Sequence, residues 1–548
     1  MGTARTHARN LAANWIGHGA NLVAMFFLSP FIVHTLGKTE YGIWSLLTVL
    51  TGYMGLLDIG VRSSTGRFIA LYLGRNDHRR IDETIRTGLG IFSAVGLIML
   101  RGSVGLGYGF PFFFESVPPR YGDLVLALLP VLAVNLWVSG LVAVFSSVLT
   151  AHDRFDLTRG VDIIVLGVRT GGTVAALMAG YGMVGMTAAI LGAHVVGLLG
   201  NWWLAKRTYP RLKIWPPAFL RRRTREMFGY GIPAFVSRIA YKIIGQTDMV
   251  IVGAVLGVAA VTPYSVGAML VMYSASFLGH VNSTFFPTIQ RAAARGEDET
   301  VRWYYFRQLR LAAIVGLPVY IGYVVFGEIF IHLWMGDETF GPASVASAGA
   351  VMAILSAAKC LHLFADPSKP VLFALGHIRY SAAVVTLEAG LNIGFSLLFI
   401  LSLGWGLPGV AGGTLVAYAM TTAVLLPWKA HRVARIRWRP FMATVSRALV
   451  GGGAFGGWCL LVRYLFVPDS WPAFFSQVAI ALAGYVPIAL LTLVPRTDRR
   501  RLVQRLTPDR GEPEAPDGRP ADAADDAAPE EPAGSRSETE LPTGTHRE

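Results

Sequence analysis

Three charged side chains lie inside one apolar stretch of the sequence. The stretch runs from Gly229 to Leu256, long enough to cross a membrane, and contains Arg238, Lys242 and Asp248. A charge near the centre of a membrane helix costs at least about 2.5 to 3.5 kcal/mol on insertion scales, so such residues normally face a wet cavity or a partner. Arg238 and Lys242 are four residues apart and share one helical face. We therefore expect this helix to line a cavity.

Carboxyl groups in apolar segments are candidates for ion coupling and gating. Asp58, Asp248 and Glu388 are of this kind, and intramembrane carboxylates are common proton relays. We therefore consider coupling to a proton or sodium gradient. Asp58 is four residues from Arg62, a spacing that permits an ion pair that gates or shapes the cavity. Structural roles for the carboxylates, and an interfacial position for Arg62, are the alternatives.

Further cations extend the candidate cavity. Arg169 lies seven residues after Asp162, on roughly the same helical face, and Lys359 lies deep in an apolar segment of the second half. His18 adds a titratable donor, although a lone helical histidine is commonly a packing residue. The predicted cationic lining consists of Arg238, Lys242, Arg62, His18, Arg169 and Lys359.

The elements that must position these residues are membrane helices. Hydrophobic residues make up 53% of the chain and charged residues 15%, against roughly 25% charged residues in soluble proteins. Apolar runs near 20 residues, the length that spans about 30 Å of hydrocarbon, recur along the chain. The fold class expected is an all-α, polytopic membrane protein with about fourteen transmembrane helices. The predicted spans are 12–35, 42–62, 83–108, 123–150, 161–179, 183–205, 229–255, 261–286, 308–334, 343–365, 380–402, 407–429, 444–466 and 472–494.

The positions of the basic residues predict the topology. Loops after even-numbered spans are basic, as in the run Arg221, Arg222, Arg223 and Arg225, so the positive-inside rule places both termini in the cytoplasm. The net charge of +14 follows from this topology and does not indicate a nucleic-acid partner. Beyond residue 495 a basic patch precedes a Pro-, Ala- and acid-rich stretch with almost no apolar residues, which predicts a disordered tail.

The first and seventh spans resemble each other. With an offset of 220 residues, Leu36-Gly37 falls on Leu256-Gly257 and His18 on Arg238. The loop at Gly74-Arg75-Asn76-Asp77 corresponds to Arg295-Gly296-Glu297-Asp298 after a gap of about two. Six spans separate the copies, an even number, which predicts parallel repeats; chance similarity between apolar helices is the alternative. The predicted domains are a six-helix bundle (1–205), a basic linker (206–228), a second six-helix bundle (229–430), two additional helices (431–495) and a basic patch with an acidic tail (496–548).

One stretch is specific enough to suggest a family. The run from Ser29 to Asp77, SPFIVHTLGKTEYGIWSLLTVLTGYMGLLDIGVRSSTGRFIALYLGRND, resembles the N-terminal region of polysaccharide and oligosaccharide flippases, with its Leu-Gly, Tyr-Gly and Asp-x-Gly. Gln246-Thr247-Asp248, followed by the residues 251–257 and Tyr264-Ser265-Val266, is similar to the start of that family's second half. The likeness covers helices 1 to 12 and implies a member of the MATE-like (MOP) superfamily, similar to Wzx-type O-antigen flippases.

The resemblance implies a function. Such proteins move undecaprenyl-pyrophosphate-linked oligosaccharide from the inner to the outer leaflet of the bacterial inner membrane, by alternating access, for polysaccharide and O-antigen biosynthesis. A cavity with fixed cations offsets the lost hydration of the pyrophosphate, and Arg grips phosphate in a bidentate manner, so Arg238 and Lys242 are the leading candidates for this contact. The partners implied are the glycolipid and membrane lipids, with a polymerase or glycosyltransferases as further candidates. No cofactor, metal site or catalytic residue is expected.

Four other functions are weighed against this one. The chain has no G-x-x-x-x-G-K-[ST] motif, which argues against direct ATP-driven transport. A membrane glycosyltransferase, ligase or polymerase needs a sizeable outer loop, and the longest predicted outer loop, from Phe110 to Gly122, is too small. A cation-coupled exporter of small molecules with the same fold would have a more apolar or acidic cavity. A scaffold would not require three buried charges in one span.

Overall fold

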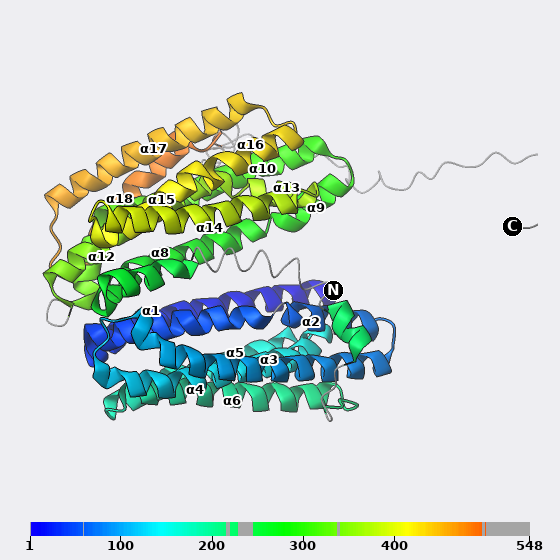
Figure 1. The fold of residues 1–548 in the computed structure, drawn as a ribbon. Coiled ribbons are helices and arrows are strands. Elements are labelled where there is room, and N and C mark those ends of the chain that lie inside the picture. The colour runs from blue at the N-terminus through cyan, green and yellow to red at the C-terminus, as the bar shows by residue number, and fades with distance from the viewer. Residues whose placement is uncertain are drawn as a thin grey trace, which may run out of the picture. The chain divides into compact units, whose positions relative to one another are not determined.

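The computed structural model describes residues 2–58, 60–214, 220–227, 245–336, 340–495 and 499, with side chains described from Gly17 onward except that of His18. Figure 1 shows the membrane-spanning part, residues 1–494, as two layers of helices. The first layer contains α1 (Gly2–Met54), η1 (Gly55–Asp58), α2 (Val61–Leu73), α3 (His78–Phe113), η2 (Pro119–Tyr121), α4 (Gly122–Ala151), α5 (Phe155–Met178) and α6 (Gly182–Thr208).

The second layer begins with a short helix over residues 245–251 and a π-helical turn, η3 (Val252–Leu256). It continues with α8 (Val258–Ser283), α9 (Phe286–Ala294), α10 (Asp298–Met335), α12 (Pro342–Ala365), α13 (Ser368–Ala374), α14 (Ile378–Leu401), α15 (Gly406–Met420), α16 (Thr422–Val433), α17 (Trp438–Leu465) and α18 (Trp471–Thr492). No strand occurs among the described residues.

The prediction of an all-α, polytopic membrane protein is confirmed. Within the described ranges, 12 stretches are long and apolar enough to cross a membrane. The first, Gly19–Leu73, contains two predicted spans because α1 continues through a bend. The predicted seventh span falls partly outside the described residues, and its described end is the apolar segment Gly245–Leu256.

One predicted boundary was wrong. The second span was predicted to continue to residue 62, whereas α1 ends at Met54 and the chain restarts at α2 after Gly60, whose φ is 74°. The twelfth predicted span, 407–429, corresponds to the apolar stretch Gly406–Val433, inside which a break at Thr421 separates α15 from α16. A hydropathy window does not register such breaks, because one apolar stretch continues across each of them.

The backbone supports the predicted internal repeat at two pairs of positions. Gly37 (φ 75°, ψ 171°) and Gly257 (φ 94°, ψ 160°) lie 220 positions apart and adopt the same unusual conformation, which favours glycine. Asn76 and Gly296 are also 220 apart and both have positive φ. The amide that follows each of them bonds to the carbonyl five residues earlier, at 3.0 Å in both loops. The loops therefore match without the gap of about two that the sequence suggested.

The two layers touch where α1 and α8 cross, just after the two bends. Thr262 of α8 donates its hydroxyl hydrogen to the carbonyl oxygen of Lys38 at 2.6 Å. A Cβ on Gly42 of α1 would overlap the carbonyl oxygen of Val258. Gly42 and Thr262 are equivalent under the repeat, as are Lys38 and Val258, so the crossing is itself two-fold symmetric. We call this crossing the closed end; the N-terminus of α1 lies at the opposite end (Figure 1).

Candidate functional site

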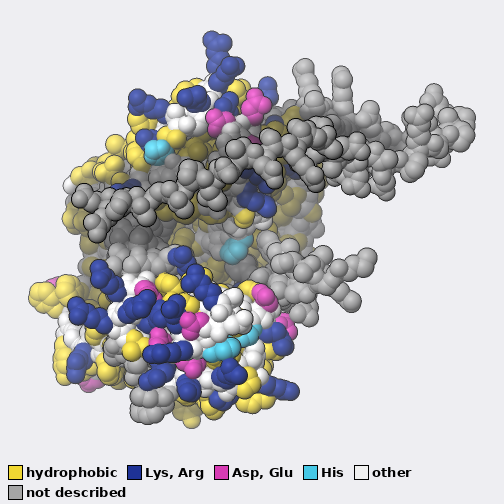
Figure 2. Space-filling view, turned by 90° about the vertical axis from the view of Figure 1, so that its right-hand side faces the viewer, with side chains coloured by type: hydrophobic (Ala, Val, Ile, Leu, Met, Phe, Trp, Pro, Cys, Tyr) yellow, Lys and Arg dark blue, Asp and Glu magenta, His cyan; other side chains and the backbone are white. Residues whose placement is uncertain are grey.

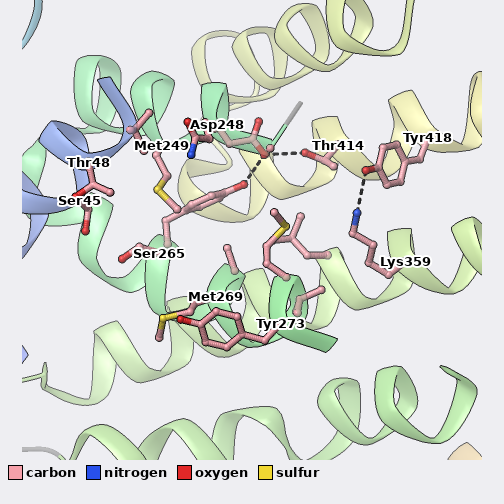
Figure 3. Close-up of a pocket in the computed structure, with 18 of the residues that line it drawn as sticks. Ser45, Thr48, Asp248, Met249, Ser265, Met269, Tyr273, Lys359, Thr414 and Tyr418 are labelled. Carbon is pink, nitrogen blue, oxygen red and sulfur yellow. Dashed lines mark hydrogen bonds between the residues drawn. The ribbon is translucent and has the colours of Figure 1, made fainter. Parts of the chain in front are cut away.

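The two layers enclose a cavity of about 470 Å³ (Figure 3). Trp44, Ser45 and Thr48 of α1 line one wall, and residues of α8, α12, α14 and α15 line the others. Most of the lining is apolar, so the few polar groups in it stand out. Of the predicted site residues, Asp248, Lys359 and Glu388 line this cavity.

Asp248 is buried, with 6% of its surface exposed. Its Oδ2 accepts hydrogen bonds from the Tyr264 hydroxyl at 2.7 Å and from the Thr414 hydroxyl at 2.9 Å. The amide of Asn392 donates to Thr414 at 2.7 Å. Oδ1 of Asp248 and Oδ1 of Asn392 are buried and have no hydrogen-bond partner among the described residues. The site therefore has two oxygen atoms that can accept a hydrogen bond or contact a cation, and the carboxylate oxygen of Asp248 can also take up a proton.

Lys359 lies near this group, as Figure 3 shows. Its ammonium donates to the hydroxyl of Tyr418 at 2.9 Å and lies 4.8 Å from the centre of that ring. The other face of the site is formed by His362, whose ring stacks on Tyr418 at 5.1 Å. Lys359 is thus held by an aromatic hydroxyl and has no ion pair among the described residues.

Beyond Lys359 the polar groups continue toward the end of α12. Nε2 of His362 lies 3.0 Å from Oδ1 of Asp366, and the ammonium of Lys369 lies 2.7 Å from the same oxygen. Burial alone raises the pKa of Asp366, but His362 and Lys369 outweigh it and hold that pKa well below its usual range. Asp366 is therefore ionised.

Glu388 lies in α14, 2% exposed. Its Oε2 accepts hydrogen bonds from the hydroxyls of Thr421 and Thr422, at the break between α15 and α16. No cation forms an ion pair with it within the described ranges. Its carboxyl is thus held by neutral donors, as the carboxyl of Asp248 is.

The predicted cations of the first half form a separate group. Arg169 of α5 donates to Oδ1 of Asn21 at 2.8 Å and interacts electrostatically with Tyr273 of the cavity wall. Arg62 lies 3.8 Å from Asp58, but 51% of the Arg62 side chain is exposed. An ion pair this exposed contributes less than about 1 kcal/mol. The pair is present, and its role in gating stays a prediction.

The remaining predicted residues are not described. Arg238 and Lys242 lie outside the described residues, as does the side chain of His18. Sequence reasoning missed His194, which interacts electrostatically with Arg169 and Arg62. It also missed the neutral partners Tyr264, Asn392, Thr414 and Tyr418, and the group of His362, Asp366 and Lys369. Within the described residues, no group of three His, Cys, Asp or Glu side chains is placed to hold a metal ion.

Comparison with known proteins identifies similar membrane proteins. Residues 103–339 match a family described as polysaccharide biosynthesis protein. The membrane protein EpsK of Bacillus subtilis is 20% identical, covering 92% of this chain and 98% of its own. Agl15 of Haloferax volcanii, described as a probable low-salt glycan biosynthesis flippase, is 24% identical, covering 93% and 100%. A putative O-antigen transporter of Shigella flexneri is 22% identical, covering 60% and 77%.

Solved structures establish the fold. The lipid II flippase MurJ in an inward closed conformation aligns with a TM-score of 0.66 and 12% identity, covering 90% of this chain and 100% of its own. A multidrug resistance MATE transporter in an inward-facing conformation aligns with a TM-score of 0.62 and 17% identity, covering 76% and 95%. The resemblance inferred from the sequence is therefore confirmed: the chain is similar to polysaccharide biosynthesis membrane proteins and has the fold of the MATE-like superfamily.

Proposed function

We propose that this protein flips undecaprenyl-pyrophosphate-linked oligosaccharide from the inner to the outer leaflet of the bacterial inner membrane, by alternating access, for polysaccharide or O-antigen biosynthesis. The observation that carries the proposal is a cavity between two repeated halves, in a chain whose relatives are described as a glycan flippase and an O-antigen transporter. Such repeats typically rock against each other around a central site.

The charges support an orientation. Figure 2 views the end opposite the closed end, where Lys and Arg side chains gather over the first layer. Exposed members include Arg67, Arg75, Arg79 and Arg154. By the positive-inside rule this face is cytoplasmic. The closed end would then face the outside, and we infer an inward-facing arrangement that receives substrate from the cytoplasmic side.

The cations support a pyrophosphate-linked substrate. Arg62, Arg169 and His194 lie in the first half, and Arg238 and Lys242, on the span that opens the second half, are the expected direct contacts. Arg matches phosphate geometry with two parallel donors, and an ammonium adds a point charge. Asp58, Asp248 and Glu388 are the proposed residues for coupling or gating. The lipid tail would remain in the bilayer, so the cavity has to hold only the head group.

Several finer points belong to the same proposal. We expect both termini in the cytoplasm and an acidic tail without a fold of its own. A polymerase or glycosyltransferases would supply or consume the substrate. We expect no enzymatic activity, since the relatives with described functions are a flippase and a transporter.

A test is reconstitution in liposomes with a fluorescent polyprenyl-pyrophosphate oligosaccharide, following its appearance in the opposite leaflet with and without a proton or sodium gradient. We expect flipping that depends on the protein and that is abolished in the double variant Arg238→Ala with Lys242→Ala, at unchanged protein level. Normal polymer export by that variant in cells would remove these two residues from the site.

One observation favours a second candidate, a cation-coupled exporter of small molecules. Met25, Met249, Met269 and Met272 line the cavity, and flexible methionines suit varied apolar ligands. Efflux of small organic cations from the liposomes, with no flipping of any glycolipid, would establish this alternative.

A further inference from the structure

Polar groups from three helices of the second half lie on one wall of the cavity: Asp248, Lys359 of α12, and Thr414 with Tyr418 of α15. Thr414 and Tyr418 are four residues apart on α15, so they lie on one face with their Cα atoms about 6 Å apart along the axis. Thr414 bonds to Asp248 and Tyr418 bonds to Lys359. The carboxyl of Asp248 and the ammonium of Lys359 are therefore held one helical turn apart by neighbouring residues of one helix, as Figure 3 shows.

The charges of this wall do not balance. Asp248, Glu388 and Asp366 supply three carboxyl groups, whereas Lys359 and Lys369 supply two ammonium groups. If His362 carries no charge, the three carboxyl groups exceed the two ammonium groups by one. A buried excess charge is costly and is normally neutralised by a proton or a bound cation. The wall thus has room for one exchangeable positive charge.

The hydrogen bonds indicate where that charge belongs. Oδ1 of Asp248 and Oδ1 of Asn392 are both buried acceptors without a donor, and the amide of Asn392 interacts with the carboxyl of Asp248. Buried polar atoms are nearly always paired. One proton on Asp248 supplies the missing donor, whereas a sodium ion that contacts these two oxygen atoms would compete with the ammonium of Lys359 for the carboxylate.

Lys359 is surrounded by carboxylates without being paired to any. Its ammonium interacts electrostatically with Asp366, Glu388 and Asp248, yet its hydrogen bond goes to Tyr418. The charged and titratable groups around it are His362 and Asp366 at the end of α12, Lys369 of α13, Glu388 of α14, Tyr418 of α15, Tyr320 of α10 and Asp248. A lysine side chain is long and flexible, so this ammonium can approach Asp248 when that carboxylate is ionised.

We propose that Lys359 is a built-in counter-cation that excludes sodium from the Asp248 site and makes a proton the coupling ion. With Asp248 protonated, Lys359 stays on Tyr418. With Asp248 ionised, the ammonium neutralises it and occupies the space that an inorganic cation would need. The assignment of a coupling role to this site rests on the function proposed above, but the exclusion of sodium by Lys359 does not.

The test uses the purified full-length protein in detergent, without glycolipid. Thermal stability is measured in about 150 mM sodium chloride and in the same concentration of N-methyl-D-glucamine chloride, because a ligand that binds only the folded state raises the melting temperature. We expect no difference for the wild type, stabilisation by sodium of at least about 2 °C for Lys359→Gln, and no difference for the double variant Lys359→Gln with Asp248→Asn. Lys359→Arg keeps the charge and should stay insensitive to sodium.

A gain of sodium binding cannot result from misfolding, so the Lys359→Gln result is informative on its own. Sodium stabilisation of the wild type that Asp248→Asn removes would overturn the proposal, as would a folded Lys359→Gln without any sodium response. If Lys359→Gln does not fold, radioactive sodium binding to the wild type decides: binding that depends on Asp248 refutes the proposal.

In liposomes that do flip glycolipid, a pH gradient should stimulate flipping and a sodium gradient should not. An absence of all flipping would contradict the proposed function and leave the detergent result standing.

Discussion

Gly42 offers a direct way to shift the balance between the two proposed conformations. A Cβ at this position would overlap the carbonyl oxygen of Val258 and approach Cγ1 of Val258 to 3.1 Å. Both contacts exist only while α1 and α8 cross at the closed end. Gly42→Ala should therefore penalise this arrangement by about 1 to 3 kcal/mol, the usual cost of overpacking. Separation of the halves at this end relieves the clash, so the outward-open population should rise roughly 5- to 150-fold.

The assay is labelling from outside the cell. Thr48 lines the cavity, so Thr48→Cys in a background with Cys360→Ala and Cys459→Ala reports outer access to a membrane-impermeant maleimide. Gly42→Ala should raise the labelling rate several-fold. The matched control is Gly105→Ala, because a Cβ at Gly105 meets nothing within 4 Å. Equal labelling rates in the two glycine variants, with both proteins folded, would refute the assignment of this crossing as the outer gate.

Three further predictions follow from the fold and its charges. Gly257→Ala should lower the free energy of unfolding by about 1 to 2 kcal/mol, and with it the melting temperature, because φ is 94° at this position and alanine is strained there. Gly279→Ala should change the melting temperature little, because a Cβ at Gly279 meets no other atom within 4 Å. Similar melting curves for both variants would contradict the strained conformation. Arg62→Gln should change stability by less than about 1 kcal/mol because the side chain is half-exposed, so a loss of flipping at unchanged melting temperature would support a substrate role, and full flipping activity would argue against one. Burial alone raises the pKa of Glu226, but its bonds with Arg223 lower it below the ordinary value. The stability it contributes is present above the ordinary pKa and lost as the pH falls through the lowered one, so from about pH 5 to about pH 3 the melting temperature of the wild type should fall more than that of Glu226→Gln. Parallel pH profiles would show that the pair contributes nothing.

The fold was predictable because its strongest signals are local. Apolar runs of membrane-spanning length and basic loops identify membrane helices without knowledge of their neighbours. The repeat was also visible, because only glycine adopts the bend at Gly37 and Gly257 without strain. The loop register was missed by about two residues, since Asn76 and Gly296 are different residue types that share a positive φ.

Some residues of the candidate site could be predicted from the sequence, and others could not. Asp248, Lys359 and Glu388 could be found because a charged residue inside an apolar run is easily recognised in the sequence. Thr414 and Tyr418 could not, because a hydroxyl in a membrane helix costs little and is common. Their importance comes from partners on other helices: Thr414 bonds to a residue 166 positions away, a distance over which helical periodicity carries no information.

The missed residues also change the interpretation of those that were found. From the sequence, Lys359 counts as one more cation for the substrate and Asp248 as one more carboxylate for coupling. The structure places them one turn apart along α15, held by Thr414 and Tyr418, where each affects the charge of the other. Under the proposal above, Lys359 belongs with the coupling residues rather than with the cations proposed to bind phosphate. Substitutions at Lys359 should alter the ion dependence of flipping more than the affinity for the glycolipid, and the opposite pattern would return Lys359 to the substrate site.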